Sequence, residues 1–92
     1  MSHLWRADAW CETRGDWRWG APGTASAHAG YEGGIGFAPS TWRWWAGVTG
    51  WLRVYPHAYD APARVQSAVA EYGLDHYGRW GCLWQPSVWR WR

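Results

Sequence analysis

The sequence predicts a small α+β domain that is mainly helical, with three main helices and one short glycine-rich β-hairpin. Its 92 residues are enough for one hydrophobic core and too few for a second. Aromatic residues make up 20% of the chain, a share that excludes a disordered or linker-like protein. Helix signals occur in three segments, and stretches rich in glycine or broken by proline separate them.

The first helix is expected over residues 2–13. Ser2 is its expected cap, and Gly15 follows closely enough to end it. Within this segment, apolar side chains recur at helical spacing at Leu4, Ala7, Trp10 and Cys11. The stripe predicts that one face of the helix packs on the core.

Two further helices are expected in the second half of the chain. Ser40 is the expected N-cap of the second helix, whose body covers residues 41–46. The third helix is expected to start at Asp60 or Ala61, with Pro62 in its first turn. One face of this third helix is expected to carry Val65, Ala68, Val69 and Tyr72.

A glycine-rich region separates the first two helices. Residues 20–30 are mostly Gly, Ala, Ser and Pro, and we expect a loop there. The following segment, residues 31–37, contains Gly33, Gly34 and Gly36. So many glycines argue against a regular strand and favour a tight hairpin or a closely approached backbone.

Composition excludes several classes of function. The net charge of +2 is too small to indicate a DNA or RNA partner. No apolar run reaches the roughly 18 residues that a membrane span needs, so no membrane insertion is expected. Two cysteines and four scattered histidines form no zinc pattern, so neither a metal nor a cofactor is expected.

Cys11 and Cys82 lie near opposite ends of the chain, and their spacing leaves two interpretations open. A disulfide between them would stabilise the fold by about 4 kcal/mol on the chain-entropy model and would imply an oxidising, extracellular setting. The alternative is a pair of buried free thiols in a cytosolic protein.

Glu12 is the candidate for acid–base chemistry. It lies at the end of the first expected helix, where the partial negative charge of the helix terminus disfavours a carboxylate. The indoles of Trp10, Trp17 and Trp19 are near in sequence and would desolvate it. Both effects favour the protonated carboxyl that a general acid needs. On position alone, an ordinary surface glutamate is the better interpretation.

Five blocks of the sequence add a resemblance to this local argument. Residues 10–17 (WCETRGDW) are similar to the Cys-Glu-x-x-Gly-x-Trp signature of resuscitation-promoting factor domains, which are lysozyme-like, transglycosylase-like domains of actinobacteria that cleave peptidoglycan. Four further blocks resemble motifs of the same family, in the family's order: residues 31–37 (YEGGIGF), 40–42 (STW), 66–71 (QSAVAE) and 77–82 (YGRWGC). Together the blocks cover roughly residues 4–83, and their order makes them more specific than any one alone.

The resemblance implies a lysozyme-like catalytic domain over residues 1–83, followed by a Trp/Arg-rich tail over residues 84–92. It implies a disulfide between Cys11 and Cys82. It also implies that Glu12 is the catalytic acid, which protonates the β-1,4 glycosidic oxygen between N-acetylmuramic acid and N-acetylglucosamine. The sugar's own 6-hydroxyl or a water molecule would then attack, with Glu12 as base. The expected function is therefore a peptidoglycan-degrading glycosidase, either a muramidase or a lytic transglycosylase.

Two positions depart from the family pattern. Gly36 stands where the family usually carries glutamine or a similar polar residue, so one sugar hydrogen bond is expected to be missing. Glu32 replaces the second tyrosine of the family's hairpin. It is either a base or cation stabiliser for the reaction or, as we favour, a solvated charge on the hairpin.

Substrate contacts are expected from the hairpin and from the second helix and the loop after it. Aromatic faces suit polysaccharides because the C–H faces of sugars are apolar while their edges need hydrogen bonds. Three tryptophans are candidate sugar platforms, although each fits the core equally well, and Thr41 is either a substrate ligand or a helix-start hydroxyl. The expected substrate-binding set is Glu32, Gly34, Thr41, Trp44, Trp45 and Trp51.

The expected partners are peptidoglycan glycan strands, bound by a monomer that acts in an extracellular or cell-wall setting. No secretion signal begins the sequence, which fits a phage lysin, a phage tail domain or an excised domain. The alternating Trp and Arg of residues 84–92 suit an anionic surface or a junction to a neighbouring domain, and we favour the junction. Two alternative functions remain: a non-catalytic glycan-binding module on the same fold, and a membrane-active or nucleic-acid-stacking protein that depends on the tail.

Overall fold

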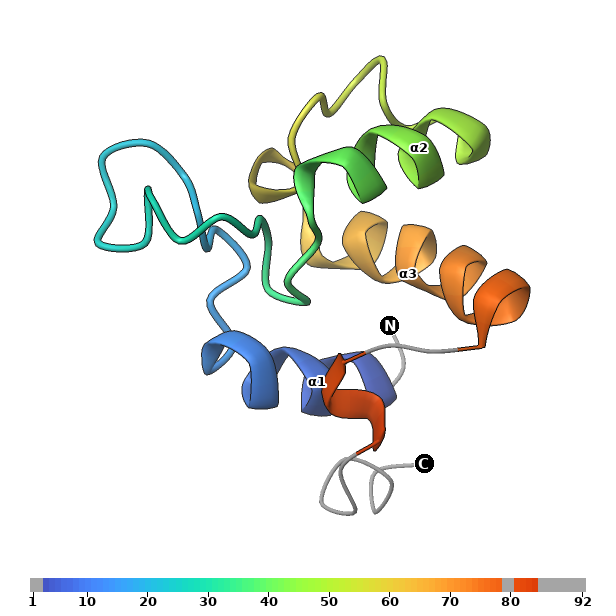
Figure 1. Ribbon diagram of the computed structural model, residues 1–92, viewed down its shortest axis with the longest axis horizontal. Coiled ribbons are helices and arrows are strands. Elements are labelled where there is room, and N and C mark those ends of the chain that lie inside the picture. The colour runs from blue at the N-terminus through green and yellow to red at the C-terminus, as the bar shows by residue number, and fades with distance from the viewer. Residues whose placement is uncertain (1–2, 79–80, 85–92) are drawn as a thin grey trace.

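Three α-helices carry most of the secondary structure in the computed structural model, which describes residues 3–78 and 81–84 (Figure 1). Helix α1 covers His3–Thr13, α2 covers Pro39–Thr49 and α3 covers Ala63–Tyr77. Two short 3-10 helices are added, η1 at Ala58–Asp60 and η2 at Gly81–Trp84. The Cα radius of gyration of 12.1 Å is close to the value of about 12 Å expected for a compact domain of this length. The predictions of a mainly helical domain and of three main helices are confirmed.

The helices form two groups in space. Helices α2 and α3 pack side by side, and η2 packs against α1 (Figure 1). A disulfide joins Cys11 of α1 to Cys82 of η2, with a Cα–Cα distance of 6.0 Å, and neither cysteine is free. The disulfide is thereby confirmed, and the alternative of two free thiols is wrong.

Helix α2 is longer at both ends than the sequence predicts. Pro39 occupies its first turn, where a missing N–H loses no helical hydrogen bond. Ala38 is the N-cap and makes no side-chain capping bond, so the prediction of Ser40 as N-cap is wrong. The helix ends at Gly50, which adopts the left-handed conformation that favours glycine.

Helix α3 starts later than predicted, at Ala63. Asp60 belongs to η1, and Ala61 and Pro62 are both extended, with Pro62 as N-cap. The extended backbone follows from the proline, which disfavours the helical conformation in the residue before it. Ser2, the expected cap of the first helix, lies outside the described residues.

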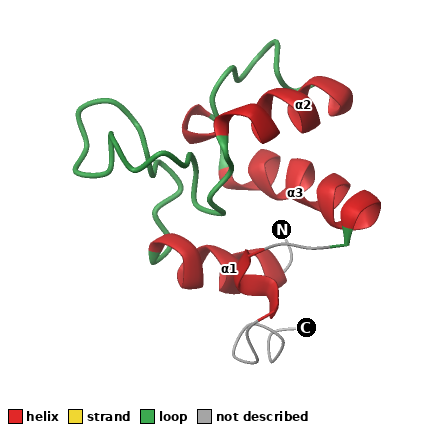
Figure 2. Ribbon diagram, viewed as in Figure 1, coloured by secondary structure: helices red, strands yellow, loops and turns green. Residues whose placement is uncertain are grey.

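The glycine-rich segment reverses the chain without forming a regular hairpin. A single antiparallel bridge joins Glu32 and Phe37 through two N–H···O bonds of 2.8 Å, and the described residues contain no strand (Figure 2). Gly33 and Gly36 have φ values of +81° and +78°, which a glycine adopts at little cost. These conformations turn the chain too tightly for a second pair of residues to join the bridge. We call residues 31–37 the glycine-rich turn.

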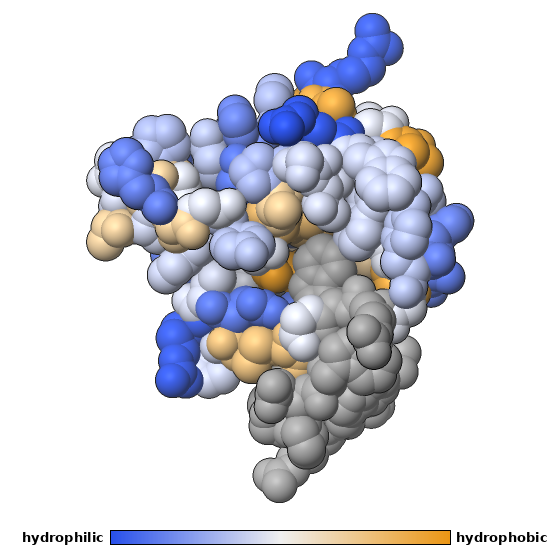
Figure 3. Space-filling model, viewed as in Figure 1, coloured by the Kyte–Doolittle hydropathy of each residue, from blue (hydrophilic) through white to orange (hydrophobic). Residues whose placement is uncertain are grey.

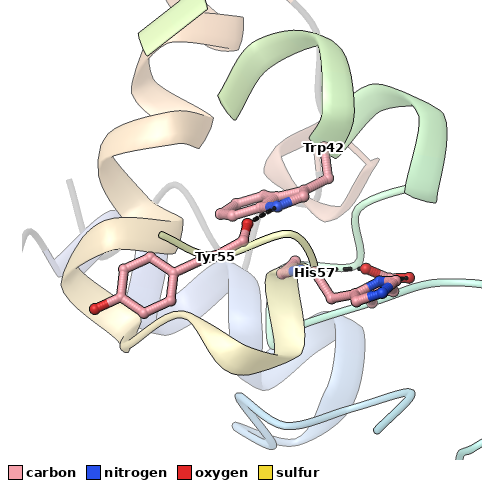
Figure 4. Close-up of polar contacts among 5 residues, drawn as sticks. Trp42, Tyr55 and His57 are labelled. Atoms are coloured by element: carbon pink, nitrogen blue, oxygen red, sulfur yellow. Dashed lines mark hydrogen bonds and ion pairs between the residues drawn. The ribbon is translucent and has the colours of Figure 1, made fainter. Parts of the chain in front are cut away.

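The core lies between the three helices and the glycine-rich turn. Its largest fully buried apolar side chains are Trp5, Ile35, Phe37, Trp42, Val65 and Val69. Trp42 donates its indole N–H to the carbonyl of Tyr55 at 2.8 Å, so its one polar atom is satisfied (Figure 4). Ala68, predicted on the buried face of α3, is exposed, and only part of that predicted stripe reaches the core.

Gln66 fastens the loops to α3. Its side-chain carbonyl accepts the N–H of Gly34 at 2.9 Å. Its amide nitrogen lies 2.7–2.9 Å from the carbonyl oxygens of Trp17, Ala58 and Ala61. Gln66 is completely buried, and these bonds satisfy its polar atoms. A single side chain thereby holds the glycine-rich turn, the segment before it and η1 against one helix.

Candidate active site

A cavity of about 530 Å³ lies where the end of α1, the glycine-rich turn and the first half of α2 meet. Its volume falls in the range of pockets that bind small ligands or parts of polymers. Its described lining is Glu12, Thr13, Trp19, Ala29, Tyr31, Gly36, Phe37, Ala38, Thr41, Trp45 and Gly81. The face drawn in Figure 3 is mostly pale or blue, and strongly hydrophobic residues show only in small patches. Four aromatic side chains and the carboxyl group of Glu12 belong to the cavity lining.

The carboxyl group of Glu12 is held at one oxygen. Glu12 is half-buried in the last turn of α1, and its Oε1 accepts the backbone N–H of Cys82 at 2.8 Å. Cys82 is in turn linked covalently to Cys11, the residue next to Glu12. The disulfide and the hydrogen bond together fix this carboxyl between α1 and η2, and this arrangement joins residues 70 positions apart.

Two glycines leave room around this carboxyl. A Cβ atom added at Gly81 would overlap Oε1 of Glu12, and one added at Gly36 would lie 3.4 Å from Oε2. Both glycines line the cavity, so the carboxyl meets backbone there instead of side chains. Gly36 also has a positive φ, so an L-residue at that position would strain the turn. The conformation of the turn therefore favours glycine at position 36 over the polar residue of the family pattern.

Aromatic side chains form much of the remaining wall. Trp19, Tyr31, Phe37 and Trp45 all line the cavity, and Tyr31 is exposed at 56%. The backbone of Trp19 is tied to the turn, since its carbonyl accepts the N–H of Gly33 at 2.8 Å. Neither Trp19 nor Tyr31 is among the substrate-binding residues predicted from the sequence. Their proximity depends on contacts between loops, for which a single sequence carries no signal.

Of the predicted site residues, the structure brings Glu12, Thr41 and Trp45 together around the cavity. Thr41 is half-buried in the first turns of α2. Trp45 is exposed at only 7%, because Gly73 of α3 leaves space for its ring. Trp45 therefore serves as a wall packed on the core more than as an exposed platform.

Three other predicted residues lie outside the cavity lining. Gly34 is buried, and both its backbone polar groups are used: its N–H by Gln66 and its carbonyl by the Thr13 hydroxyl at 2.9 Å. Trp51 is half-buried against the core, and its ring is 6.2 Å from that of Tyr55. Trp44 is exposed at 55% on α2 and contacts other rings, described below.

Glu32 is also outside the cavity lining, and it is not the solvated charge that we favoured. It is exposed at only 8%. Its Oε1 accepts the N–H of Ala58 at 3.1 Å, and its Oε2 lies 3.2 Å from Nδ1 of His57 (Figure 4). A buried carboxylate needs such partners, and here they tie the glycine-rich turn to the start of η1. His57 and Glu32 are 25 residues apart, and no local pattern in the sequence indicates the pair.

Of the three indoles expected near Glu12, one shares the cavity lining with it. Trp19 lines the same cavity as Glu12. Trp17 lies against Gly34, where an added Cβ would be 2.7 Å from its ring. Trp10 is exposed at 60%, and the guanidinium carbon of Arg14 lies 5.5 Å from its ring centroid.

The described residues contain no group of three or more side chains able to hold a metal ion. None of the helices in the described ranges is long and apolar enough to cross a membrane. No protein-family model matches the chain, and no curated protein is significantly similar to it.

Proposed function

We propose that this protein is a peptidoglycan-degrading glycosidase that cleaves the β-1,4 bond between N-acetylmuramic acid and N-acetylglucosamine. The observation that carries the proposal is the placement of Glu12. Its carboxyl is half-buried, held through one oxygen by the N–H of Cys82, and open to an aromatic-walled cavity. A positioned carboxyl of this kind acts as general acid on the glycosidic oxygen.

The walls of the cavity suit a sugar polymer. The rings of Trp19 and Tyr31 offer apolar faces to the C–H faces of pyranose rings. The hydroxyl of Thr41 offers a hydrogen-bonding group for a sugar edge. Together with the ordered family motifs, these features favour a cell-wall glycan strand as the substrate of a lysozyme-like domain related to the resuscitation-promoting factors.

The lining also supports a particular second step. Glu12 is the only carboxylate among the described residues that line the cavity. Glycosidases with two catalytic carboxyls hold them about 5–10 Å apart across the bond, and Glu32 is engaged elsewhere. We infer that the 6-hydroxyl of the muramic acid attacks its own anomeric carbon as the bond to the leaving oxygen breaks. Glu12, having given its proton to that oxygen, takes the proton of the attacking hydroxyl, and the product is an anhydro sugar.

The proposed setting is extracellular or the cell wall, with glycan strands as partner and the protein acting as a monomer. The disulfide supports an oxidising compartment, because such bonds persist outside the cytosol. Residues 85–92 of the Trp/Arg-rich tail lie outside the described residues, so its two interpretations stand as before.

The test is the release of soluble fragments from purified cell walls by the wild type and by Glu12→Gln. The amide keeps the shape of the side chain and removes the proton to be transferred. We expect release to fall by about 10²–10⁴-fold, with wall binding and melting temperature unchanged. Undiminished release by Glu12→Gln would remove Glu12 from the mechanism. Mass spectrometry of the fragments distinguishes the anhydro product from the hydrolysed one, which carries one additional water.

A second candidate is a non-catalytic glycan-binding module on the same fold. The observation that favours it is Gly36, which places no polar side chain beside the Glu12 carboxyl. On this alternative, the wild type sediments with cell walls and releases no fragments.

A further inference from the structure

The aromatic wall of the cavity continues beyond it. Trp45, which lines the cavity, stacks on Tyr77 with ring centroids 5.4 Å apart and an interplanar angle of 6°. Tyr77 in turn meets Trp44, at 5.2 Å and 59°. Three aromatic rings therefore run in contact from the wall of the cavity onto the surface formed by α2 and the end of α3.

The outer two rings are not part of the core. Trp44 is exposed at 55% and Tyr77 at 46%. Neighbouring exposed aromatic side chains on a small domain mark a binding surface more often than isolated ones do. The planes of Trp44 and Tyr77 are inclined to each other by 59°, and the two exposed rings lie beside the buried ring of Trp45.

The imidazole of His76 is a polar group near these two exposed rings. His76 is exposed, and its ring centroid lies 6.4 Å from that of Tyr77. Its Nδ1 lies 2.8 Å from the carbonyl oxygen of Tyr72. Since a carbonyl only accepts, Nδ1 donates in this contact, and Nε2 is the second hydrogen-bonding atom of the ring. Flat apolar faces with hydrogen-bonding groups at their edge match a pyranose ring, whose faces are apolar and whose rim carries hydroxyls.

We propose that Trp44 and Tyr77 form a second glycan subsite, which binds a sugar of the same strand whose glycosidic bond lies at Glu12. The inference builds on the proposed function and extends it to a strand longer than the cavity alone would hold. The argument for a glycan as occupant is continuity: Trp45 belongs to the cavity wall and contacts Tyr77 directly. The subsite predicts that affinity depends on oligosaccharide length.

The experiment measures dissociation constants by calorimetry for N-acetylglucosamine disaccharide, tetrasaccharide and hexasaccharide, in the Glu12→Gln background so that nothing is cleaved. We expect Trp44→Ala and Tyr77→Ala to weaken hexasaccharide binding roughly tenfold, equivalent to about 1.4 kcal/mol, and to leave the disaccharide unchanged. Trp44→Phe keeps an aromatic face and should restore most of the affinity. Trp10→Ala is the matched control, since Trp10 is an equally exposed indole outside the cavity lining.

Each outcome decides between the two proposals. Equal effects of Trp44→Ala and Trp10→Ala on the hexasaccharide, or no effect of either, would overturn the subsite and leave the proposed reaction untouched. A length-dependent loss in Trp44→Ala, with no wall fragments released by the wild type, would support the subsite and overturn the reaction. A change in oligomeric state of Trp44→Ala on size exclusion, with unchanged affinity, would assign the surface to self-association instead.

Discussion

Glu12 and Glu32 are the same residue type in opposite surroundings. Glu12 is half-buried, accepts the N–H of Cys82 through Oε1, and lines an open cavity. Glu32 is almost fully buried, is engaged through both oxygens by Ala58 and His57, and lies outside the cavity lining. Glu32 belongs to the glycine-rich turn, and the carboxyl of Glu12 lies beside Gly36 of the same turn.

The difference shows how one side chain is kept for structure and another for chemistry. A carboxylate whose two oxygens are engaged within the protein stabilises the segments that it joins. A carboxyl with one oxygen oriented and the other beside a cavity can exchange a proton with a ligand. We therefore assign Glu32 to the architecture of the turn, and we propose Glu12 for catalysis.

The largest expected effect comes from exchanging each carboxyl for an amide. Glu12→Gln should lower the rate of wall digestion by about 10²–10⁴-fold at an unchanged melting temperature. Glu32→Gln should keep the rate within a few-fold, because Glu32 does not line the cavity, and should lower the melting temperature. Turbidity clearing of cell walls and thermal denaturation check both halves. Equal loss of rate in the two variants would contradict the assignment of Glu12 to catalysis and Glu32 to structure.

The next largest effect is expected from removal of the disulfide, because this bond holds Cys82, whose N–H orients the carboxyl of Glu12. Cys11→Ser with Cys82→Ser should lower the free energy of unfolding by about 4 kcal/mol, since the bond closes a loop with a sequence separation of 71. The rate should also fall at temperatures where the variant is folded, because Cys82 orients Glu12. Denaturant unfolding and the rate well below the melting temperature measure the two effects. A variant with full activity there would show that η2 is not needed to place the carboxyl.

A smaller and more selective effect is expected from Gly81→Ala. The new methyl group would overlap Oε1 of Glu12, the end of a flexible side chain that can move aside. We expect the rate to fall roughly tenfold while the melting temperature changes by only about 1–2 °C. Gly47→Ala on α2 is the matched control, because its added Cβ would have only an ordinary contact with Leu52. If both variants digest walls at the wild-type rate, the space around Glu12 is not under tight constraint.

The smallest expected effect is on stability at alkaline pH, and it concerns Tyr59, whose pKa is raised in part by the charge of Glu32. Desolvation raises the pKa of Tyr59 above its usual value of 10.0, and the charges of Glu32 and Asp60 raise it further, while Arg18 opposes them. The folded protein therefore keeps this proton at a pH where the unfolded chain has lost it. Stability from this group is complete below pH 10.0 and is lost as the pH rises through the higher folded value.

Melting temperatures measured from about pH 9 to about pH 11 check this expectation. Tyr59→Phe should show a shallower decline than the wild type over this range. Glu32→Gln should lie between them, because it removes one of the charges that raise the pKa of Tyr59. Identical slopes for the wild type and Tyr59→Phe would contradict the role given to this hydroxyl.

The sequence by itself determined the three helices, because apolar spacing and the glycines and prolines between segments are local signals. It also pointed to Glu12 and to the disulfide, the latter through the motifs that contain Cys11 and Cys82. The bounds of the helices are wrong only at their ends, as at Ser40, because a proline and a backbone conformation decide those ends and the side-chain pattern does not. Within α3, Ala68 is exposed, although the apolar pattern predicts that it is buried.

Only the tertiary structure decided which side chains share a site. Glu32 and His57 are ordinary polar residues in sequence, and their pairing depends on η1 folding beside the glycine-rich turn. Trp44 and Trp45 are adjacent tryptophans with opposite surroundings, one exposed and one buried against Gly73. The physical reason is that hydropathy tells whether an indole favours burial, whereas the neighbours that bury it come from distant parts of the chain.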